Sequence, residues 1–302
     1  MRVDSGSKVL ITGATGQVAF PVAMALAVDH DVTAIARFSD SSKRTALEAA
    51  GVRCVEVDLV KADFADVPTD CDYVANFAVL KSGKWDLDVN RYAESISLLM
   101  EHARSAKAFL HCSSTGVYQP AGAHALKETD PLGDNHRAMM PTYSISKIAA
   151  EVMVRYSARR FSIPTTIARL NVPYGDEGGW PAFHLAMMRA GQPIPVHADR
   201  PNLFNPIHHD DIARMVPALL DSAGGTATGE VTIVNWGGNE TVSLEEWCAV
   251  LGEEARCAPT FVETDSTIGG VRVDLTLMHE LVGPTKIDWR EGMRRLVAAH
   301  PA

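Results

Sequence analysis

Short apolar runs alternate with longer amphipathic stretches over roughly the first 172 residues of the chain. The apolar runs are rich in β-branched residues and predict strands at 8–12, 32–36, 52–57, 73–78, 107–112 and 164–170. Helical patterns lie between them, including residues 41–51, with a serine cap and a terminal glycine, and a long stretch at about 86–105. Strands separated by helices of this length need parallel crossover connections. The sequence therefore predicts an α/β fold with a Rossmann-type, doubly wound parallel sheet.

The pattern loosens after about residue 172, where proline, glycine and histidine separate shorter elements. This change predicts two domains: a dinucleotide-binding domain at 1–172 and a smaller, substrate-binding C-terminal lobe at 173–302. Some strands and helices of the lobe are expected to return to the sheet. Because no linker composition marks the boundary, the lobe is expected to pack directly on the sheet.

Composition narrows the class of partner. The chain has 302 residues, of which 46% are hydrophobic, and a formal net charge of -9 without basic blocks. This balance argues against nucleic acid and against an anionic membrane as partners. The five cysteines are scattered without metal-ligand spacing, which predicts free thiols and no metal site. With no apolar signal segment and no run of 18 apolar residues, the expected location is cytoplasmic.

The first chemical motif is "TGATGQVA", which follows the first predicted strand and opens a helix. Glycines at this place let the backbone turn tightly and approach a pyrophosphate, which the helix N-terminus stabilises. Dinucleotide binding is therefore favoured over a purely structural turn. The expected contacts in this segment are Gly13, Thr15, Gly16, Gln17 and Val18.

The end of the second predicted strand bears on the choice of nicotinamide cofactor. An NAD site usually has a carboxylate about 20 residues past the glycines, but here that place is Ala36, followed by Arg37. An arginine pairs with a 2′-phosphate, whereas a carboxylate repels it. NADP(H) is therefore favoured, with NAD(H) as the alternative. A solvated arginine without a cofactor role is the competing interpretation.

A phenol and an ammonium lie four positions apart in "YSISK", at Tyr143 and Lys147. On a helix these side chains share one face. If Ser114, after the strand at 107–112, and Tyr143 both contact one substrate oxygen, the serine holds the oxygen and the tyrosine exchanges its proton. Lys147 then lowers the phenol pKa from ~10. The three residues predict hydride transfer between an alcohol and a nicotinamide, with Tyr143 as the acid/base.

These segments, with "DL" at 58–59, "NFAVLK" at 76–81 and "SSTGVY", resemble the extended short-chain dehydrogenases/reductases, the NAD(P)-dependent epimerase/dehydratase group. The resemblance extends over "RLNVPYG", "NPIHHDDIA" and "VNWGGNETVSLEEW" in the later half. It implies that Ser114, Tyr143 and Lys147 are catalytic. It also implies a homodimer built from the helix at 86–105 and the helix that carries Tyr143. The remaining cofactor contacts that it implies are Asp58, Leu59, Phe77, Ala78, Lys81, Tyr143 and Lys147.

Departures from the family pattern narrow the reaction. Sugar dehydratases of the group have a motif like "S-T-D-E-V-Y", whose carboxylates move protons during loss of water. This chain has Thr115 and Gly116 at those two places, so dehydration is not expected. Plain oxidation or reduction remains, as does epimerisation by an oxidise, rotate and reduce cycle.

The choice between these two reactions depends on how a substrate diphosphate would be bound. "NFAVLK" resembles UDP-galactose 4-epimerases, which favours epimerisation. However, Asn171 lies one place before the asparagine that such enzymes direct at the diphosphate, and Phe204 replaces an expected arginine. Arg200 is a nearby alternative donor. A diphosphate needs positive donors to offset its desolvation. Thr115, Asn171 and Phe204 are the expected substrate contacts.

Two further patterns have plain structural interpretations. "HHDD" at 208–211 is read as the end of a strand followed by a helix with Asp210 as N-cap, rather than as a metal site. Trp180, Phe183, Met187 and Met188 follow helical spacing and either cover a substrate or pack in a core or dimer interface.

The sequence leads to three hypotheses. The first is an NADP(H)-dependent reductase or dehydrogenase that acts on a secondary alcohol or ketone of a sugar-like or small cyclic molecule. The alternative is a nucleotide-sugar epimerase that retains NAD. The third, a non-enzymatic NADP(H) sensor, is disfavoured by the intact Ser114, Tyr143 and Lys147 set.

Overall fold

The structure, a computed structural model, describes residues 3–199, 202–224 and 229–301. Arg200, considered above as a diphosphate donor, lies outside the described residues. The chain forms two compact units. The first comprises Met1–Ser113, Ile145–Arg169 and Ala213–Val234, and the second Ser114–Ser144, Leu170–Ile212 and Asn235–Ala302. The chain thus passes between the units several times, whereas the predicted division has one boundary at residue 172.

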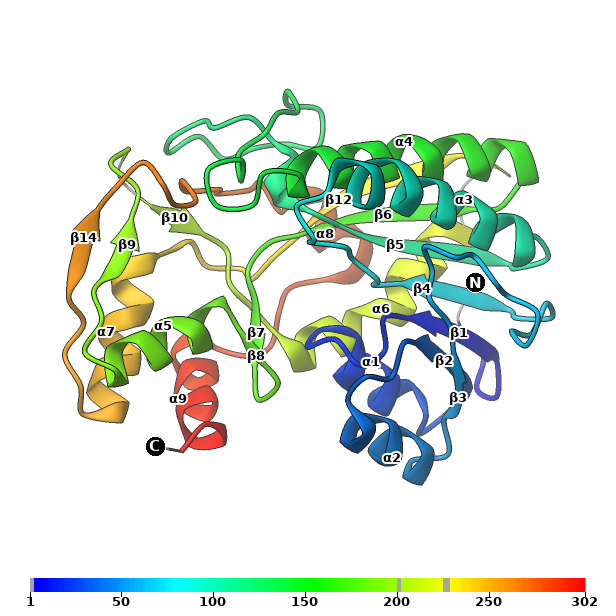
Figure 1. The fold of residues 1–302 in the computed structure, drawn as a ribbon, viewed down its shortest axis with the longest axis horizontal. Helices are drawn as coiled ribbons and strands as arrows, with labels where there is room; N and C mark the ends of the chain where they lie inside the picture. The colour runs from blue at the N-terminus through cyan, green and yellow to red at the C-terminus, as the bar shows by residue number, and fades with distance from the viewer. Residues whose placement is uncertain (1–2, 200–201, 225–228, 302) are drawn as a thin grey trace. The chain divides into compact units, whose positions relative to one another are not determined.

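The first unit is built on a seven-stranded sheet with the order β12-β6-β5-β4-β1-β2-β3 (Figure 1). The β1·β2, β2·β3, β1·β4 and β4·β5 pairs are all parallel. The order runs outward from β1 in both directions, which confirms the doubly wound α/β prediction. The strands are β1 (Lys8–Thr12), β2 (Asp31–Ala36), β3 (Arg53–Glu56), β4 (Tyr73–Asn76), β5 (Ala108–Ser114), β6 (Thr165–Leu170) and β12 (Val231–Trp236).

The helices that alternate with these strands are α1 (Ala19–Leu26), α2 (Ser41–Ala49), α3 (Tyr92–His102), α4 (Tyr143–Phe161) and α6 (His209–Gly224). The cap of α2 is Asp40, whose carboxylate accepts from the backbone N–H groups of Ser42 and Lys43, and not a serine as predicted. The predicted long helix at 86–105 is divided. A π-helical turn, η1 (Asp86–Arg91), precedes α3. In the described part of the chain, no helix is long and apolar enough to cross a membrane.

One buried apolar cluster of the first unit lies between the sheet and the helices α3 and α4. Alternate residues of a strand point to opposite faces, and the inward residues of this face pack with both helices. Figure 1 shows α3 and α4 side by side, where the hydroxyls of Ser97 and Ser157 are 2.7 Å apart. The buried apolar cluster includes Leu10, Ile35, Val74 and Phe109 of the strands with Tyr92, Ile96, Leu99, Ala150 and Val154 of the helices.

The described residues of the second unit form short strands and helices. β7 (Pro173–Gly175) pairs with β8 (Gly178–Gly179) and β11 (Ile207–His208), β10 (Leu203–Phe204) with β13 (Val242–Ser243), and β9 (Ile194–Val196) with β14 (Phe261–Glu263). A 3-10 turn, η2 (Thr115–Val117), follows β5. The helices are α5 (Trp180–Arg189), α7 (Leu244–Ala255), α8 (Thr276–Val282) and α9 (Trp289–Ala299). A capping box between Ser243 and Glu246 starts α7.

An aromatic cluster fills the centre of the second unit. The Trp180 ring contacts Phe204 edge-on at 5.2 Å between centroids and Trp247 at 5.7 Å. The His184 ring stacks on Trp247, whose indole N–H donates to His184 Nδ1 at 3.0 Å. Burial lowers the pKa of His184 to about 4, so this histidine is neutral near pH 7. Trp180, which is itself partly buried, therefore packs against buried aromatic side chains of this unit.

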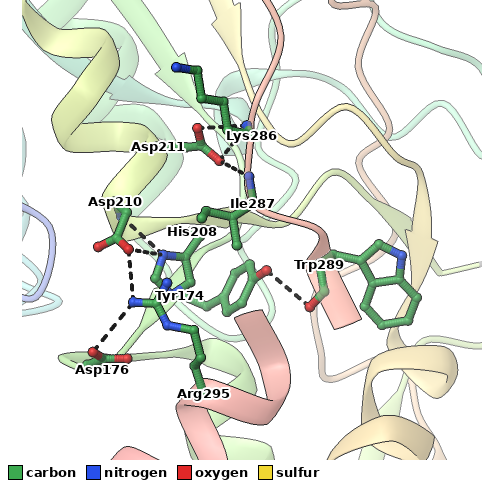
Figure 2. A network of polar contacts seen from close by, with 9 residues as sticks. All are labelled: Tyr174, Asp176, His208, Asp210, Asp211, Lys286, Ile287, Trp289 and Arg295. Carbon is green, nitrogen blue, oxygen red and sulfur yellow. Dashed lines mark hydrogen bonds and ion pairs between the residues drawn. The ribbon is translucent and has the colours of Figure 1, made fainter. Parts of the chain in front are cut away.

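The "HHDD" segment makes several polar contacts within the second unit (Figure 2). The helix α6 begins at His209, so Asp210 lies in its first turn and is not the N-cap that was predicted. Asp210 pairs with Arg295 at 2.8 Å, and its backbone N–H donates to His208 Nδ1. Asp211 accepts the backbone N–H groups at residues 286 and 287 at 2.8–3.0 Å. Among the described residues, no group of three or more His, Cys, Asp or Glu side chains is placed to hold a metal ion.

Candidate functional site

The turn after β1 brings two segments of backbone into close contact. Gly13 has φ +67°, and a Cβ atom there would lie 2.9 Å from Cα of Ala78. The N–H of Gly16 donates to the carbonyl of Gly13 at 2.8 Å, which closes the turn just before α1. Only glycine combines this dihedral angle with this space. The turn therefore leaves backbone N–H groups at the start of a helix, the arrangement that binds a pyrophosphate.

A buried polar chain across the three neighbouring strands β1, β4 and β5 supports this turn, and the sequence analysis did not predict it. The Thr12 hydroxyl accepts from the backbone N–H groups of Phe77 at 3.2 Å and Ala78 at 3.1 Å, and it donates to the Asn76 side chain. The Asn76 amide in turn lies 2.9 Å from His111 Nδ1. Burial holds the pKa of His111 well below its usual range, so the ring is neutral. The sequence signal was a polar residue within each of three apolar strands.

A pocket of the first unit opens beside this turn. It brings together eight of the predicted cofactor contacts: Gly13, Thr15, Gly16, Arg37, Asp58, Leu59, Phe77 and Ala78. Ile35, Ala36, Ser39, Val57, Val60, Val79, Leu80 and Tyr92 complete its lining. Gln17, Val18, Lys81, Tyr143 and Lys147 are not among the lining residues. The glycine turn at one place and apolar side chains elsewhere fit a dinucleotide, with its pyrophosphate at the turn and its bases against the apolar walls.

The rim of the pocket beyond β2 includes two residues that follow this strand. The Arg37 side chain is exposed there and lines the pocket next to Ser39. By contrast, Arg44 pairs with Glu48 at 2.8 Å on α2 and covers the Phe38 ring. Arg37 is thus the arginine that lies at the pocket, in the position expected for a 2′-phosphate ligand.

Lys147 is buried on α4, one turn after Tyr143. Only 3% of the residue is exposed, and its Nζ donates to the carbonyl of Cys112 on β5 at 2.9 Å. Burial lowers its pKa to about 8, and the positive charge of Lys81 acts in the same direction. The ammonium form still dominates at pH 7. The lysine therefore carries a charge next to the end of β5 in a place shielded from water.

The last two residues of β5 have different partners. They were expected just after the strand but belong to it. The Ser113 hydroxyl donates to Glu151 Oε1 at 2.5 Å, whereas the Ser114 hydroxyl accepts the Gly116 N–H at 3.0 Å. Neighbouring strand residues point to opposite faces, so only one of the two serines lies on the side of the η2 turn. The two serines thus differ in their surroundings: Ser113 binds a carboxylate, whereas Ser114, the predicted catalytic serine, contacts the η2 turn.

Tyr143 is the first residue of α4 and is half-buried. Its ring stacks on that of His136, with 5.5 Å between centroids and 20° between planes. His136 also covers Gly116, two residues after Ser114. Its neighbour Asn135 is buried, and among the described residues neither polar atom of its side chain has a hydrogen-bond partner. Sequence reasoning missed this segment, because a loop contact leaves no periodic pattern.

The predicted substrate contacts are buried in the second unit. Asn171 uses its amide fully: Nδ2 donates to Thr115 Oγ1 and to the carbonyl of Val271, while Oδ1 accepts the backbone N–H groups of Val172 and Asn205. Thr115 is 5% exposed and Phe204 is 2% exposed. Asn171 therefore joins four segments of this unit. Phe204 lies in the aromatic cluster, where protein side chains cover its ring.

Solved structures of similar fold come from enzymes of nucleotide sugars. The UDP-glucuronic acid 4-epimerase from Bacillus cereus, in complex with UDP-glucuronic acid and NAD, has a TM-score of 0.81 and 19% identity over 95% of this chain and 97% of that chain. A dTDP-glucose 4,6-dehydratase from Streptomyces venezuelae with NAD and TYD bound has a TM-score of 0.80 and 19% identity over 97% and 96%. At this identity, the likeness establishes a shared fold.

Curated relatives include trifunctional UDP-glucose 4,6-dehydratase/UDP-4-keto-6-deoxy-D-glucose 3,5-epimerase/UDP-4-keto-L-rhamnose-reductases of Arabidopsis thaliana. One is 26% identical over 251 residues, which make up 73% of this chain and 36% of the relative. Another is 32% identical over 122 residues, or 38% of this chain and 17% of the relative. The chain thus spans about a third or less of the length of these relatives.

The family comparison covers the glycine turn, the cofactor pocket and the three predicted catalytic residues. The model of the NAD dependent epimerase/dehydratase family matches residues 9–235. The match spans well over half of the 302 residues, from β1 to the end of the large sheet. This chain is therefore an enzyme that belongs to the NAD dependent epimerase/dehydratase family.

Proposed function

We propose that this protein is an epimerase of nucleotide sugars. It oxidises a ring hydroxyl to a ketone, lets the ketone rotate within the site, and reduces it from the other face. The observation that carries the proposal is the set of residues at the end of β5 and the start of α4. Ser114, Tyr143 and Lys147 supply what hydride transfer needs, and no carboxylate stands at Thr115 or Gly116. Such a set serves exchange of hydride and proton without elimination of water.

Local packing supports the exclusion of dehydration. The Thr115 hydroxyl is held by Asn171 at 3.1 Å, and the His136 ring fills the space above Gly116. A dehydratase needs an acid that delivers a proton to the leaving hydroxyl. The two similar structures come from enzymes of nucleotide sugars and contain NAD, which supports a nucleotide sugar as the substrate.

In this proposal each residue has one task. The Ser114 hydroxyl holds the substrate oxygen, and Tyr143 removes its proton during oxidation and returns it during reduction. Lys147 stabilises the phenolate, since a buried positive charge favours the ionised form of a neighbouring phenol. The nicotinamide, when bound, accepts and returns the hydride. The pocket at the glycine turn holds the dinucleotide that carries it.

A second candidate, an NADP(H)-dependent reductase, rests on a specific observation. Arg37 lines the cofactor pocket at the rim where an adenosine 2′-phosphate would lie. An enzyme that exchanges its cofactor in each turnover gains from discrimination at this phosphate, whereas an epimerase that retains NAD does not need it. In addition, Phe204 stands where the family resemblance implies an arginine, and Asn171 lies one place before the implied asparagine, which speaks against a diphosphate ligand.

Two measurements separate the candidates. The nucleotide released from freshly purified, denatured protein is identified by mass spectrometry. The protein is then incubated with UDP- and dTDP-hexoses without added cofactor, and the sugars are followed by NMR. Retained NAD and interconversion of one epimer pair support the epimerase. Empty protein, no change in any sugar, and NADPH consumption with a ketone panel would replace it by the reductase.

A further inference from the structure

The ring of His136 lies face-on over Gly116. A Cβ atom at position 116 would lie 2.8 Å from Cε1, 2.9 Å from Nε2 and 3.0 Å from Nδ1 of the imidazole. Three ring atoms at nearly equal distances from one point mean that the ring presents its face and not its edge. Real Cβ atoms do not approach other atoms this closely, so any larger residue at 116 displaces the ring. Glycine at this position makes room for the imidazole.

The same imidazole stacks on Tyr143. The ring centroids are 5.5 Å apart and the planes differ by 20°. The backbone of the histidine is tied to the start of α4, because its N–H donates to the Ser144 hydroxyl at 3.3 Å and its carbonyl accepts the N–H of Met140 at 2.7 Å. The η2 turn on one side and the first turn of α4 on the other therefore determine where the ring lies.

The position of the tyrosine at the helix start makes this contact consequential. Tyr143 is the first residue of α4 and is half-buried, so the helix itself holds its ring less firmly than a mid-helix position would. Proton transfer needs the phenol oxygen within hydrogen-bond reach of the substrate oxygen. A stacked aromatic neighbour restricts the ring to the orientation that preserves the stack.

We propose that His136 is a positioning residue for Tyr143, and that Gly116 is required because it admits the His136 ring. The inference rests on the proposed role of Tyr143 as the proton-transfer group. It assigns a function to a loop residue outside the Ser114, Tyr143 and Lys147 set. It also gives Gly116 a steric role: without a side chain, this residue leaves space for the imidazole ring.

Three variants form a matched test. His136→Ala removes the stack, Gly116→Ala displaces the ring, and His136→Phe keeps an aromatic ring without imidazole chemistry. With the sugar that the wild type converts, the first two should lower kcat about two- to tenfold, the equilibrium scale of one aromatic pair. KM and bound nucleotide should stay unchanged, and His136→Phe should restore kcat. Wild-type kcat in His136→Ala would overturn the proposal. Equal losses of kcat in His136→Ala and His136→Phe would also overturn it, because the ring stack would then not be the source of the effect.

A spectroscopic measurement separates this proposal from the proposed function. In protein with 13C-labelled tyrosine rings, the Tyr143 signals are assigned by comparison with Tyr143→Phe. Stacking predicts a ring-current shift that His136→Ala and Gly116→Ala abolish and His136→Phe retains. If the shift behaves in this way while no sugar is converted, the stack holds and the proposed reaction is wrong. Unchanged Tyr143 signals in His136→Ala would overturn the stack itself.

Discussion

Arg169 on β6 and Glu151 on α4 form a two-pronged ion pair that is almost completely buried. The Arg169 Nε lies 3.0 Å from Oε1, and its terminal nitrogen lies 2.8 Å from Oε2. The side chains are only 3% and 4% exposed, and Ser113 donates a third hydrogen bond to the carboxylate. Glu151 follows Lys147 by one helical turn. The pair therefore attaches the part of α4 that carries Lys147, the proposed catalytic lysine, to the large sheet.

Removal of one partner should leave the other charge buried without compensation. We expect Glu151→Ala to lower the free energy of unfolding by about 3–5 kcal/mol. The control is Glu48→Ala, which breaks the exposed pair with Arg44 and should cost less than about 1 kcal/mol. Urea unfolding at pH 7 measures both. Similar small losses in the two variants would show that the buried pair contributes no more than a surface pair.

Tyr143→Phe removes the phenol hydroxyl and keeps the ring that stacks on His136. We expect turnover to fall by about 100-fold or more, the scale of acid/base catalysis, with nucleotide binding unchanged. Single-turnover kinetics and nucleotide titration check the two parts of this prediction. The exposed Tyr156, on the same helix, serves as the control for loss of a hydroxyl. If Tyr143→Phe turns over like Tyr156→Phe, the proton follows another route.

Arg37→Asp tests the cofactor preference. The substitution places a carboxylate at the pocket rim. The affinity for NADP(H) relative to NAD(H) should therefore fall by about 100-fold or more, because a repulsive charge replaces an attractive one beside a phosphate. Arg53→Asp changes the same charge on β3, outside the pocket lining, and should leave the ratio unchanged. Fluorescence titration with NADPH and NADH measures the ratio. An unaltered ratio in Arg37→Asp would remove the 2′-phosphate role.

Gly13→Ala should disrupt the glycine turn. The new methyl group would lie 2.9 Å from Cα of Ala78, and a positive φ adds backbone strain of about 1–2 kcal/mol. Gly6→Ala is the matched control, because Gly6 also has a positive φ, +79°, but its Cβ would meet nothing within 4 Å. We expect both variants to lose stability but only Gly13→Ala to lose nucleotide binding. Calorimetry with and without nucleotide measures the stability and the nucleotide affinity of both variants. Equal nucleotide affinity in the two variants would contradict a role for the close approach of Gly13 to Ala78 in nucleotide binding.

Lys147 should make stability depend on pH in the alkaline range. Its pKa is about 8 in the folded protein against an ordinary 10.5, so between these values the unfolded chain binds a proton that the folded protein does not. The free energy of unfolding contributed by this residue should therefore rise from pH 8 to pH 10.5, by about 3 kcal/mol at most. Below pH 8 this contribution is absent. Urea unfolding of the nucleotide-free protein and of Lys147→Met measures the difference, and parallel pH curves would show that burial does not depress this pKa.

The alternation of strands and helices was enough to predict the large sheet, because apolar runs such as β4, β5 and β6 are buried along their whole length and stand out from their amphipathic neighbours. The glycine turn and Arg37 could be placed at one pocket because parallel strands present their carboxyl ends on one edge. The boundaries of the units were beyond this reasoning. Periodicity identifies an element but does not say which unit it packs in, and α4 starts in one and continues in the other.

The parts of the site that sequence reasoning missed depend on contacts between distant residues. Thr12 reads as the last residue of a strand, and only the structure shows that its hydroxyl holds the backbone after β4. Phe204 reads as a substitution in a substrate motif, but Trp180 and Trp247 surround its ring. His136 lies in an irregular loop, where no periodic sequence pattern marks it. In each case the deciding neighbour lies far along the chain or in an irregular loop.

The aromatic cluster of the second unit has an optical consequence. Of the five tryptophans, Trp85 alone belongs to the first unit, where it is 56% exposed. The others, Trp180, Trp236, Trp247 and Trp289, belong to the second unit. Indole emission thus reports mainly on the second unit, and in Trp85→Phe it reports on nothing else. The cofactor pocket has no tryptophan in its lining, so emission from a reduced nicotinamide reports on the first unit. A single fluorescence experiment can therefore follow the two units of this enzyme at two separate emission wavelengths.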